Sequence, residues 1–140
     1  TYQIKTDDFV FIDDYAHHPA EINAVHQAVR EMYPNQKVAV VFQPHLFSRT
    51  NDFADDFAAS LSQFDAVFLL EIYPARELPI EGVSSSWLLE KIKSPIKKLI
   101  SKSDIASEIK ELGYPVFMIL GAGDIGVEVS ELKEKLSYAY

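Results

Sequence analysis

The residues most able to do chemistry lie together near the start of the chain, between Asp13 and Pro19. This segment, Asp-Asp-Tyr-Ala-His-His-Pro, supplies two carboxylates, a phenol and two imidazoles. It follows the apolar run Phe9–Ile12, which is typical of a buried strand, and proline is preferred in the first turn of a helix. The segment is therefore expected at the carboxyl end of a strand, where α/β sheets bind ligands, and beside a helix N-terminus, which attracts anions. A nucleotide or phosphate site is the first hypothesis.

Within this segment, Asp14 and His17 are the leading candidates for nucleotide binding. A carboxylate could accept hydrogen bonds from ribose hydroxyls, and an imidazole could contact a phosphate. Equally, Asp14 could only cap the turn while His17 packs against its neighbours. A metal site formed by His17, His18 and Glu21 is the weaker alternative, because adjacent histidines tend to point apart and no further ligand is evident. We predict no metal site.

A second candidate site contains His45 and Arg49, which follow the apolar run Val38–Phe42. The planar guanidinium of arginine matches a carboxylate or a phosphate with two parallel hydrogen bonds. Together with the imidazole of His45, it could hold a small anionic substrate. The alternative is a solvated loop in which Ser48 or Thr50 caps a helix.

Two further segments carry weaker signals. Arg76 and Glu77 follow the apolar run Ala66–Leu70, and they are expected to pair with each other or with water, as most surface charges do. Gly121-Ala122-Gly123 follows the run Val116–Leu120 and predicts a tight turn. This segment lacks the third glycine of the dinucleotide-binding fingerprint.

The elements that must position these side chains alternate along the chain. The four apolar runs named above are nearly continuous, as expected for parallel strands that are covered on both faces. A weaker strand is expected over 95–100, nearer an edge of the sheet, and an antiparallel strand over 2–5. Strands alternating with helices predict an α/β fold, a three-layer, Rossmann-like, doubly wound and mostly parallel sheet. All four polar segments then converge on one edge of this sheet.

Apolar residues at a spacing of three to four predict the intervening helices. Ser103 is expected to open one helix and Gly113 to end it, whereas Asp124 is expected to open the last. The span from Glu71 to Ser86 has no regular pattern, and loops of that length are usually functional or mobile. The repeats that define the helices are Ile22, Val25, Val29 and Met32; Phe53, Phe57, Leu61 and Phe64; Trp87, Leu88 and Ile92; Ile105, Ile109 and Leu112; and Val129, Leu132 and Leu136.

Composition excludes several classes of partner. The chain has 140 residues, a length typical of one domain, and its net charge of −8 argues against nucleic acid or an anionic membrane, since both require basic patches. It has no cysteine, which fits a cytosolic protein, and no apolar run approaches the roughly 20 residues of a membrane span. Because the first residue is Thr1 rather than methionine, we expect a fragment of a longer protein.

In order along the chain, these segments resemble the C-terminal domain of the Mur ligases. The resemblance covers about Phe9 to Leu136, and it rests on four segments: Asp13–Pro19; Phe42–His45 with Ser48–Thr50; Tyr73–Glu77; and Gly121–Ile125. It implies the last domain of a cytoplasmic, three-domain, ATP-dependent amide ligase of peptidoglycan synthesis. In that reaction ATP phosphorylates the carboxylate of UDP-N-acetylmuramate, and the amine of L-alanine then attacks the acyl phosphate.

The resemblance also implies roles for particular residues. Asp14 and His17 would bind ATP. Tyr15, His45 and Arg49 would hold L-alanine. Further candidates at the site are His18, Arg76 and Glu77.

Two departures from the family pattern qualify these roles. Many relatives carry arginine directly after the histidine of the second segment, where this chain has Leu46, so the carboxylate of alanine would rest on Arg49 alone. No GxxxxGK[ST] occurs in the 140 residues, so the phosphate cradle and the Mg²⁺ ligand would come from the central domain. The N-terminal and central domains are therefore expected partners, and the isolated domain is expected to be inactive.

Three alternatives remain open at this point. One is the recycling ligase that attaches a preformed peptide to the same sugar nucleotide, although the segment Gln43–Thr50 favours the alanine-adding enzyme. The second is a free-standing nucleotide-binding module. The third is a metal-dependent hydrolase that uses His17, His18 and Glu21.

Overall fold

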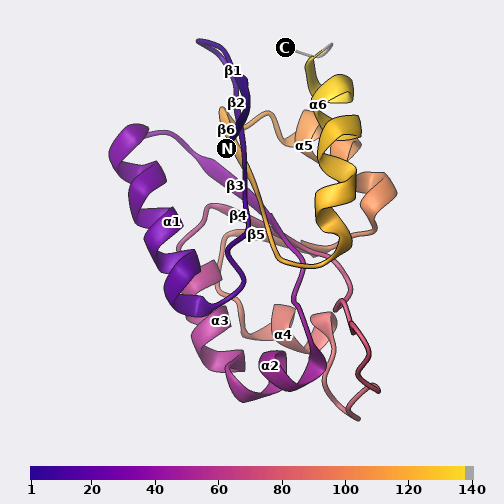
Figure 1. The fold of residues 1–140 in the computed structure, drawn as a ribbon. Helices are drawn as coiled ribbons and strands as arrows, with labels where there is room; N and C mark the ends of the chain where they lie inside the picture. Colours follow the sequence, from indigo (N-terminus) through magenta and orange to yellow (C-terminus); the bar gives the residue numbers. More distant parts are fainter. Residues whose placement is uncertain (138–140) are drawn as a thin grey trace.

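The computed structural model describes residues 1–137, which form one six-stranded sheet between two layers of helices (Figure 1). The strands are β1 (Tyr2–Lys5), β2 (Val10–Asp14), β3 (Val38–Phe42), β4 (Ala66–Leu69), β5 (Ile96–Leu99) and β6 (Val116–Leu120). The helices are α1 (Pro19–Met32), α2 (Phe47–Asp52), α3 (Ala54–Leu61), α4 (Ser85–Lys91), α5 (Ile105–Leu112) and α6 (Val129–Ser137). Short 3₁₀ helices at Lys102–Asp104 and Asp124–Glu128 precede α5 and α6.

The sheet order is β1-β2-β6-β3-β4-β5, and every pairing is parallel except that of β1 with β2. The predicted mostly parallel sheet and its antiparallel N-terminal strand are therefore confirmed. The strand expected over 95–100 is β5, and it lies at an edge. Its two lysines, Lys97 and Lys98, are exposed there, whereas all residues of β3, β4 and β6 are buried.

Each face of the sheet has its own hydrophobic core. Ile22 and Val29 of α1 pack into one core with Leu61 of α3, and α4 joins the same layer through Leu88. The opposite core contains Ile109 of α5 and Leu132 of α6. Figure 1 shows α1 and α3 on one side of the sheet and α5 and α6 on the other. Burial on both faces explains why the parallel strands are continuous apolar runs.

The region around Phe53 differs from the prediction. The spacing of Phe53, Phe57, Leu61 and Phe64 predicts one helix, but the chain bends at Phe53 between α2 and α3. Phe53 is 43% exposed, whereas Phe64 is buried although it lies beyond the end of α3. The extra helix α2 begins two residues after His45.

The starts of the last two helices also differ in detail. Ser101 rather than Ser103 caps the 3₁₀ turn that leads into α5, and its hydroxyl contacts Asp104 at 2.8 Å. Gly113 ends α5 with a φ of +69°, as predicted. Asp124 begins a 3₁₀ turn that leads into α6, but its carboxylate is used for tertiary contacts instead of capping.

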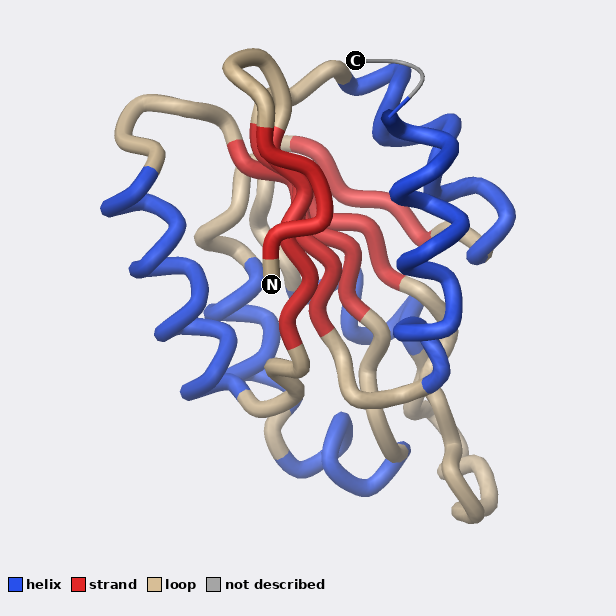
Figure 2. Tube along the Cα trace, turned by 45° about the horizontal axis from the view of Figure 1, so that its top comes forward, coloured by secondary structure: helices blue, strands red, loops and turns tan. Residues whose placement is uncertain are grey.

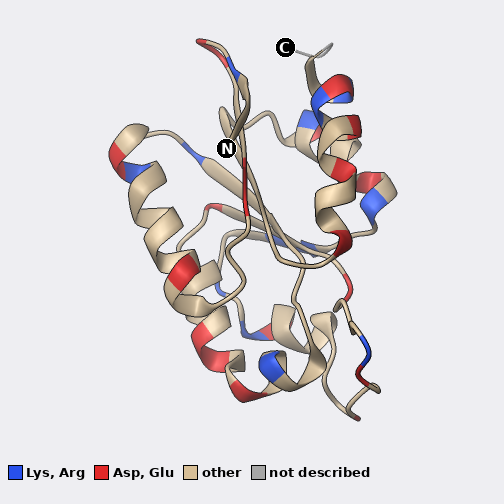
Figure 3. Ribbon diagram, in the orientation of Figure 1, with Lys and Arg blue, Asp and Glu red and all other residues tan. Residues whose placement is uncertain are grey.

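Charged positions are spread over the molecule. Figure 3 shows acidic positions on helices of both layers. Glu21 lies in α1, Asp55 in α3 and Glu131 in α6. None of the described helices combines the length and the apolar character that a membrane crossing needs.

Arg30 fastens the C-terminal end of α1 to two loops at the amino edge of the sheet. Its guanidinium donates to the carbonyl oxygens of Gln36 and Gln63 and pairs with Asp65 at 3.2 Å. Its Nε–H donates to Nε2 of His26 at 2.9 Å, and the His26 ring packs edge-on against Phe64. Burial, and next the charge of Arg30, lower the pKa of His26.

This contact predicts a pH-dependent stability. The pKa of His26 is lower in the folded chain than in the unfolded chain. At a pH near the ordinary pKa of histidine, the unfolded chain therefore binds more protons, and stability rises with pH in that range. We expect the free energy of unfolding to fall as the pH decreases from about 8 to about 5.5. His26→Gln keeps an acceptor for Arg30 without titrating, so it should flatten this dependence. Urea unfolding at several pH values measures both slopes, and identical slopes would contradict the assignment.

Candidate functional site

The four polar segments meet at the carboxyl edge of the sheet, as predicted. Figure 2 shows the connecting loops gathered at this end of the strands. The loops after β2 and β3 lead into the helical layer of α1, whereas the loop after β6 leads into α6 on the opposite face. Since β6 lies between β2 and β3, the loops diverge there. Such a switch point is where open α/β sheets bind ligands.

Asp14 caps the turn after β2 and also lines a cavity. Its Oδ1 accepts a hydrogen bond from the backbone N–H of Ala16 at 2.9 Å, which fixes the turn after β2. The side chain is nevertheless exposed, and it lines a cavity of about 310 Å³ with Tyr15, Gly121 and Gly123. One carboxylate oxygen therefore shapes the turn, and the other is available to a ligand.

Tyr15 lies beside the first candidate site. Its side chain is 70% exposed, its hydroxyl contacts the carbonyl oxygen of Ala122 at 3.4 Å, and its ring lies edge-on to His17 at 5.7 Å. Tyr15 is thus grouped with His17 on the turn after β2. The resemblance had grouped it with His45 and Arg49.

His17, His18 and Glu21 lie at the start of α1: His18 is its N-cap residue, His17 precedes it, and Glu21 lies in the first turn. One carboxylate oxygen of Glu21 accepts the backbone N–H groups of both histidines, and these bonds, that of His17 first, lower the pKa of Glu21. The expectation that the two imidazoles diverge is wrong, because their ring centroids are 4.8 Å apart. Ligating atoms of all three residues lie within 4.8 Å of one another. Two imidazoles and an already bonded carboxylate do not fit Mg²⁺, which requires oxygen ligands in octahedral geometry.

His45, on the loop after β3, forms a pair with Arg49 in the first turn of α2. Arg49 Nη1 lies 3.0 Å from His45 Nδ1, and the His45 ring stacks on Tyr73 at 5.6 Å with an interplanar angle of 13°. Burial, and then the guanidinium of Arg49, lower the pKa of His45. Because arginine can only donate, a neutral His45 accepts at Nδ1 and carries its hydrogen on Nε2. The pair therefore offers N–H donors to an anion.

The two candidate sites adjoin each other. The rings of His17 and His45 lie edge-to-face with centroids 6.3 Å apart. Residues from the turn after β2 and from the loop after β3 are therefore close enough to contact neighbouring groups of bound substrates.

Glu77 has a different role from the one expected. Its carboxylate bonds Ser48 rather than Arg76: it accepts the hydroxyl of Ser48 and the backbone N–H of Ser48 at 3.1 Å. These bonds, the hydroxyl first, lower the pKa of Glu77. Glu77 thereby holds the first turn of α2, on which Arg49 lies, so neither Ser48 nor Thr50 acts as the cap.

Arg76 and Leu46 line the same cavity. Its volume is about 570 Å³, Tyr73, Ala75 and Glu77 also line it, and Arg76 is exposed. Leu46 has a φ of +74°, a conformation that costs energy for a residue with a side chain. Neither His45 nor Arg49 lines this cavity.

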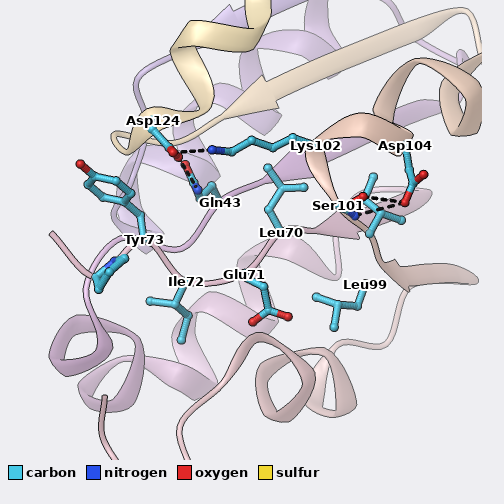
Figure 4. A pocket seen from close by; sticks show the side chains of 12 residues that line it. Gln43, Leu70, Glu71, Ile72, Tyr73, Leu99, Ser101, Lys102, Asp104 and Asp124 are labelled. Carbon is cyan, nitrogen blue, oxygen red and sulfur yellow. Dashed lines mark hydrogen bonds and ion pairs between the residues drawn. The ribbon is translucent and has the colours of Figure 1, made fainter. Parts of the chain in front are cut away.

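Sequence reasoning missed a polar group beneath the site. The side chain of Gln43 donates to Asp124 at 2.8 Å, and Lys102 pairs with the other oxygen of Asp124 (Figure 4). Burial by itself raises the pKa of Asp124, but the bonds from Lys102 and Gln43 outweigh it, so the pKa lies below its ordinary value. These residues and Tyr73 line a cavity of about 510 Å³ at the ends of β3, β4 and β5. The signals in the sequence were their positions shortly after apolar runs and, for Gln43, Tyr73 and Asp124, their place in the segments that carry the family resemblance.

Gly123 lies tightly against this group, which predicts a selective effect of substitution. A Cβ at Gly123 would lie 2.6 Å from Oε1 of Gln43 and 2.8 Å from Cβ of Tyr73, whereas one at Gly126 would meet no atom within 4 Å. We expect Gly123→Ala to cost about 1–3 kcal/mol of stability and to shift the NMR signals of the Tyr73 and His45 rings. The matched control Gly126→Ala should change stability by less than about 0.5 kcal/mol. Equal effects of the two substitutions would contradict this packing.

The chain is similar to known ligases over most of its length. It is 63% identical over 137 residues to the UDP-N-acetylmuramate–L-alanine ligase of Flavobacterium johnsoniae, covering 98% of this chain and 30% of that relative. The crystal structure of UDP-N-acetylmuramate-alanine ligase MurC from Thermotoga maritima matches with a TM-score of 0.65 and 26% identity, over 94% of this chain and 27% of that one. The chain thus spans about a third of the length of these enzymes.

A solved single domain has the same fold. It comes from a putative UDP-N-acetylmuramate:L-alanyl-γ-D-glutamyl-meso-diaminopimelate ligase of Haemophilus ducreyi, with a TM-score of 0.66 and 22% identity, over 100% of this chain and 98% of that one. The family model described as Mur ligase, glutamate ligase domain matches residues 2–126. This chain therefore belongs to the Mur ligase family, as one of its glutamate ligase domains.

Proposed function

We propose that this chain is the C-terminal domain of a longer, cytoplasmic, three-domain ligase that uses ATP to join L-alanine to UDP-N-acetylmuramate. In this proposal the domain binds ATP through the turn after β2 and the carboxylate of alanine through the loop after β3. The N-terminal and central domains of the same protein are its partners.

The observation that carries the proposal is the proximity of the two sites. The reaction requires the transferred phosphoryl group and the attacking amino acid to meet at one carboxylate. His17 on the proposed ATP side lies 6.3 Å from His45 on the proposed alanine side. A module that only bound a nucleotide would not need an anion-binding pair at this distance. The 63% identity to the alanine ligase of Flavobacterium johnsoniae supports the alanine-adding enzyme over the recycling ligase, whereas the peptide ligase domain of Haemophilus ducreyi, at 22% identity, shares only the fold.

The chemistry of this domain is limited to binding and orientation. A neutral imidazole and a guanidinium can hold the alanine carboxylate and leave its amine free to attack. The exposed oxygen of Asp14 can accept bonds from ribose hydroxyls, and His17 can contact a phosphate. Because no described group of this chain fits Mg²⁺, the ion that accompanies ATP would be bound mainly by the central domain. The 140-residue chain alone should therefore not ligate alanine.

Asp14→Asn in the full-length ligase tests the ATP role. Asparagine keeps the oxygen that accepts the N–H of Ala16, so the turn should survive, but the charged acceptor is lost. A hydrogen bond to a charged group is worth about 1.5–3 kcal/mol, so KM for ATP should rise roughly tenfold or more. KM for alanine should change little. Steady-state kinetics with each substrate varied in turn measure both values, and unchanged saturation by ATP would refute the role.

Arg49→Lys in the same enzyme tests the alanine role. Lysine keeps the charge but loses the planar pair of donors, so KM for L-alanine should rise about tenfold while KM for ATP stays within about twofold. Arg76→Lys is the matched comparison, because Arg76 is exposed and lines a cavity that neither His45 nor Arg49 lines. If Arg76→Lys impairs saturation by alanine and Arg49→Lys does not, the anchor has been assigned to the wrong arginine.

A further inference from the structure

The side chain of Gln43 is buried although it lies at the edge of an open site. It is only 4% exposed, and both ends of its amide are used. Its Nε2 donates to Asp124 at 2.8 Å, and its Oε1 accepts the backbone N–H of Ile125 at 3.0 Å. One amide from the end of β3 thus binds the loop after β6 at two successive residues, as Figure 4 shows for Asp124.

This connection continues to the proposed alanine site. The loop that Gln43 holds presses Gly123 against Tyr73, leaving no room for a Cβ. The ring of Tyr73 in turn stacks on the ring of His45, and His45 bonds Arg49. Backbone hydrogen bonds of 2.8 Å from Tyr73 to Pro44 and from Leu46 to Tyr73 join the same two segments.

We propose that Gln43 is a positioning residue: its amide holds residues 121–125 against Tyr73 and thereby sets the orientation of the His45–Arg49 pair. Only the identity of the anion, the carboxylate of alanine, rests on the function proposed above. The geometric part concerns this chain by itself.

The chemistry of an amide explains why this position requires glutamine. The side chain at this position must donate a hydrogen bond to a carboxylate and accept one from a backbone N–H at the same time. Glutamate would accept from Ile125 but would place a second carboxylate against Asp124. Leucine would fill the space but leave the N–H of Ile125 and one oxygen of Asp124 without this partner, and unpaired buried polar groups are costly.

Three variants of the 140-residue chain test the geometry: Gln43→Glu, Gln43→Leu, and Gln43→Glu combined with Asp124→Asn. The double variant reverses donor and acceptor, since the introduced asparagine can donate to the introduced glutamate, and it restores the wild-type charge of the pair. Gln27→Glu, on the exposed surface of α1, is the control for added charge. Urea unfolding checks that each variant folds.

The readout is the pKa of the His45 imidazole, followed by NMR. Arg49, His17 and Glu77 are the charged or titratable groups that act on it, and none of them is altered. Both single variants should raise this pKa toward its ordinary value, because a displaced loop leaves the Tyr73–His45 stack more hydrated. Gln43→Leu adds no charge, so a rise there reflects position alone. The double variant and Gln27→Glu should match the wild type.

Kinetics of the full-length ligase supply the second readout. Small displacements in an active site can cost large factors in rate, so kcat/KM for L-alanine should fall about tenfold in each single variant, while KM for ATP stays within about twofold. The double variant should recover alanine use to within about threefold of the wild type. A purely structural role would instead lower stability and leave the two substrates equally affected.

The outcomes separate this inference from the proposed function. Folded single variants with an unchanged His45 pKa and unchanged alanine kinetics would overturn the positioning role. A double variant that folds but restores neither the His45 pKa nor the alanine kinetics would also overturn it. If Gln43→Leu fails to fold, Gln43→Asn takes its place, because it also adds no charge and its shorter amide cannot bond both Asp124 and Ile125. A His45 pKa that shifts and is restored as expected, in an enzyme that does not use alanine, would support the positioning role and refute the proposed substrate.

Discussion

The insertion of β6 between β2 and β3 is the constraint on which the rest of the site depends. The last strand in the sequence, β6, pairs with β2, which ends at Asp14, and with β3, whose loop carries His45. Its own loop therefore emerges between them and turns to the opposite helical layer. Parallel pairing aligns the three carboxyl ends, and burial on both faces prevents the strands from slipping. Any ligand at this edge must contact segments that are distant in sequence.

Single polar side chains then give these loops their shape. Asp14 closes its own turn, Glu77 holds the start of α2, and Gln43 fastens the loop after β6. Each satisfies backbone N–H groups that would otherwise lack partners near the edge of the core. These loops have no regular structure of their own, but their anchors are specific. That combination suits a binding surface, because a fixed backbone keeps donors such as Arg49 in place for a ligand.

The domain presents one half of the chemistry that its proposed reaction requires. An imidazole, a guanidinium and a partly free carboxylate can hold an amino acid and a nucleotide, but the cradle for the phosphates is absent from the sequence. Placing amino-acid recognition and phosphate binding on different domains would couple catalysis to domain closure. Water would then be excluded from the acyl phosphate only when both substrates are in place.

The sequence by itself determined the sheet, the ends of several helices and the edge where the polar segments meet, because apolar runs, Pro19 and Gly113 act through local backbone preferences. Only the tertiary structure decided that the chain bends at Phe53, that His17 and His18 converge, and that Glu77 bonds Ser48. It also paired Gln43 with Asp124, 81 residues away. Local patterns encode periodicity and burial, but the partner of a buried polar group depends on which strands are neighbours. That order, with β6 inserted between β2 and β3, is fixed by the packing of the whole chain.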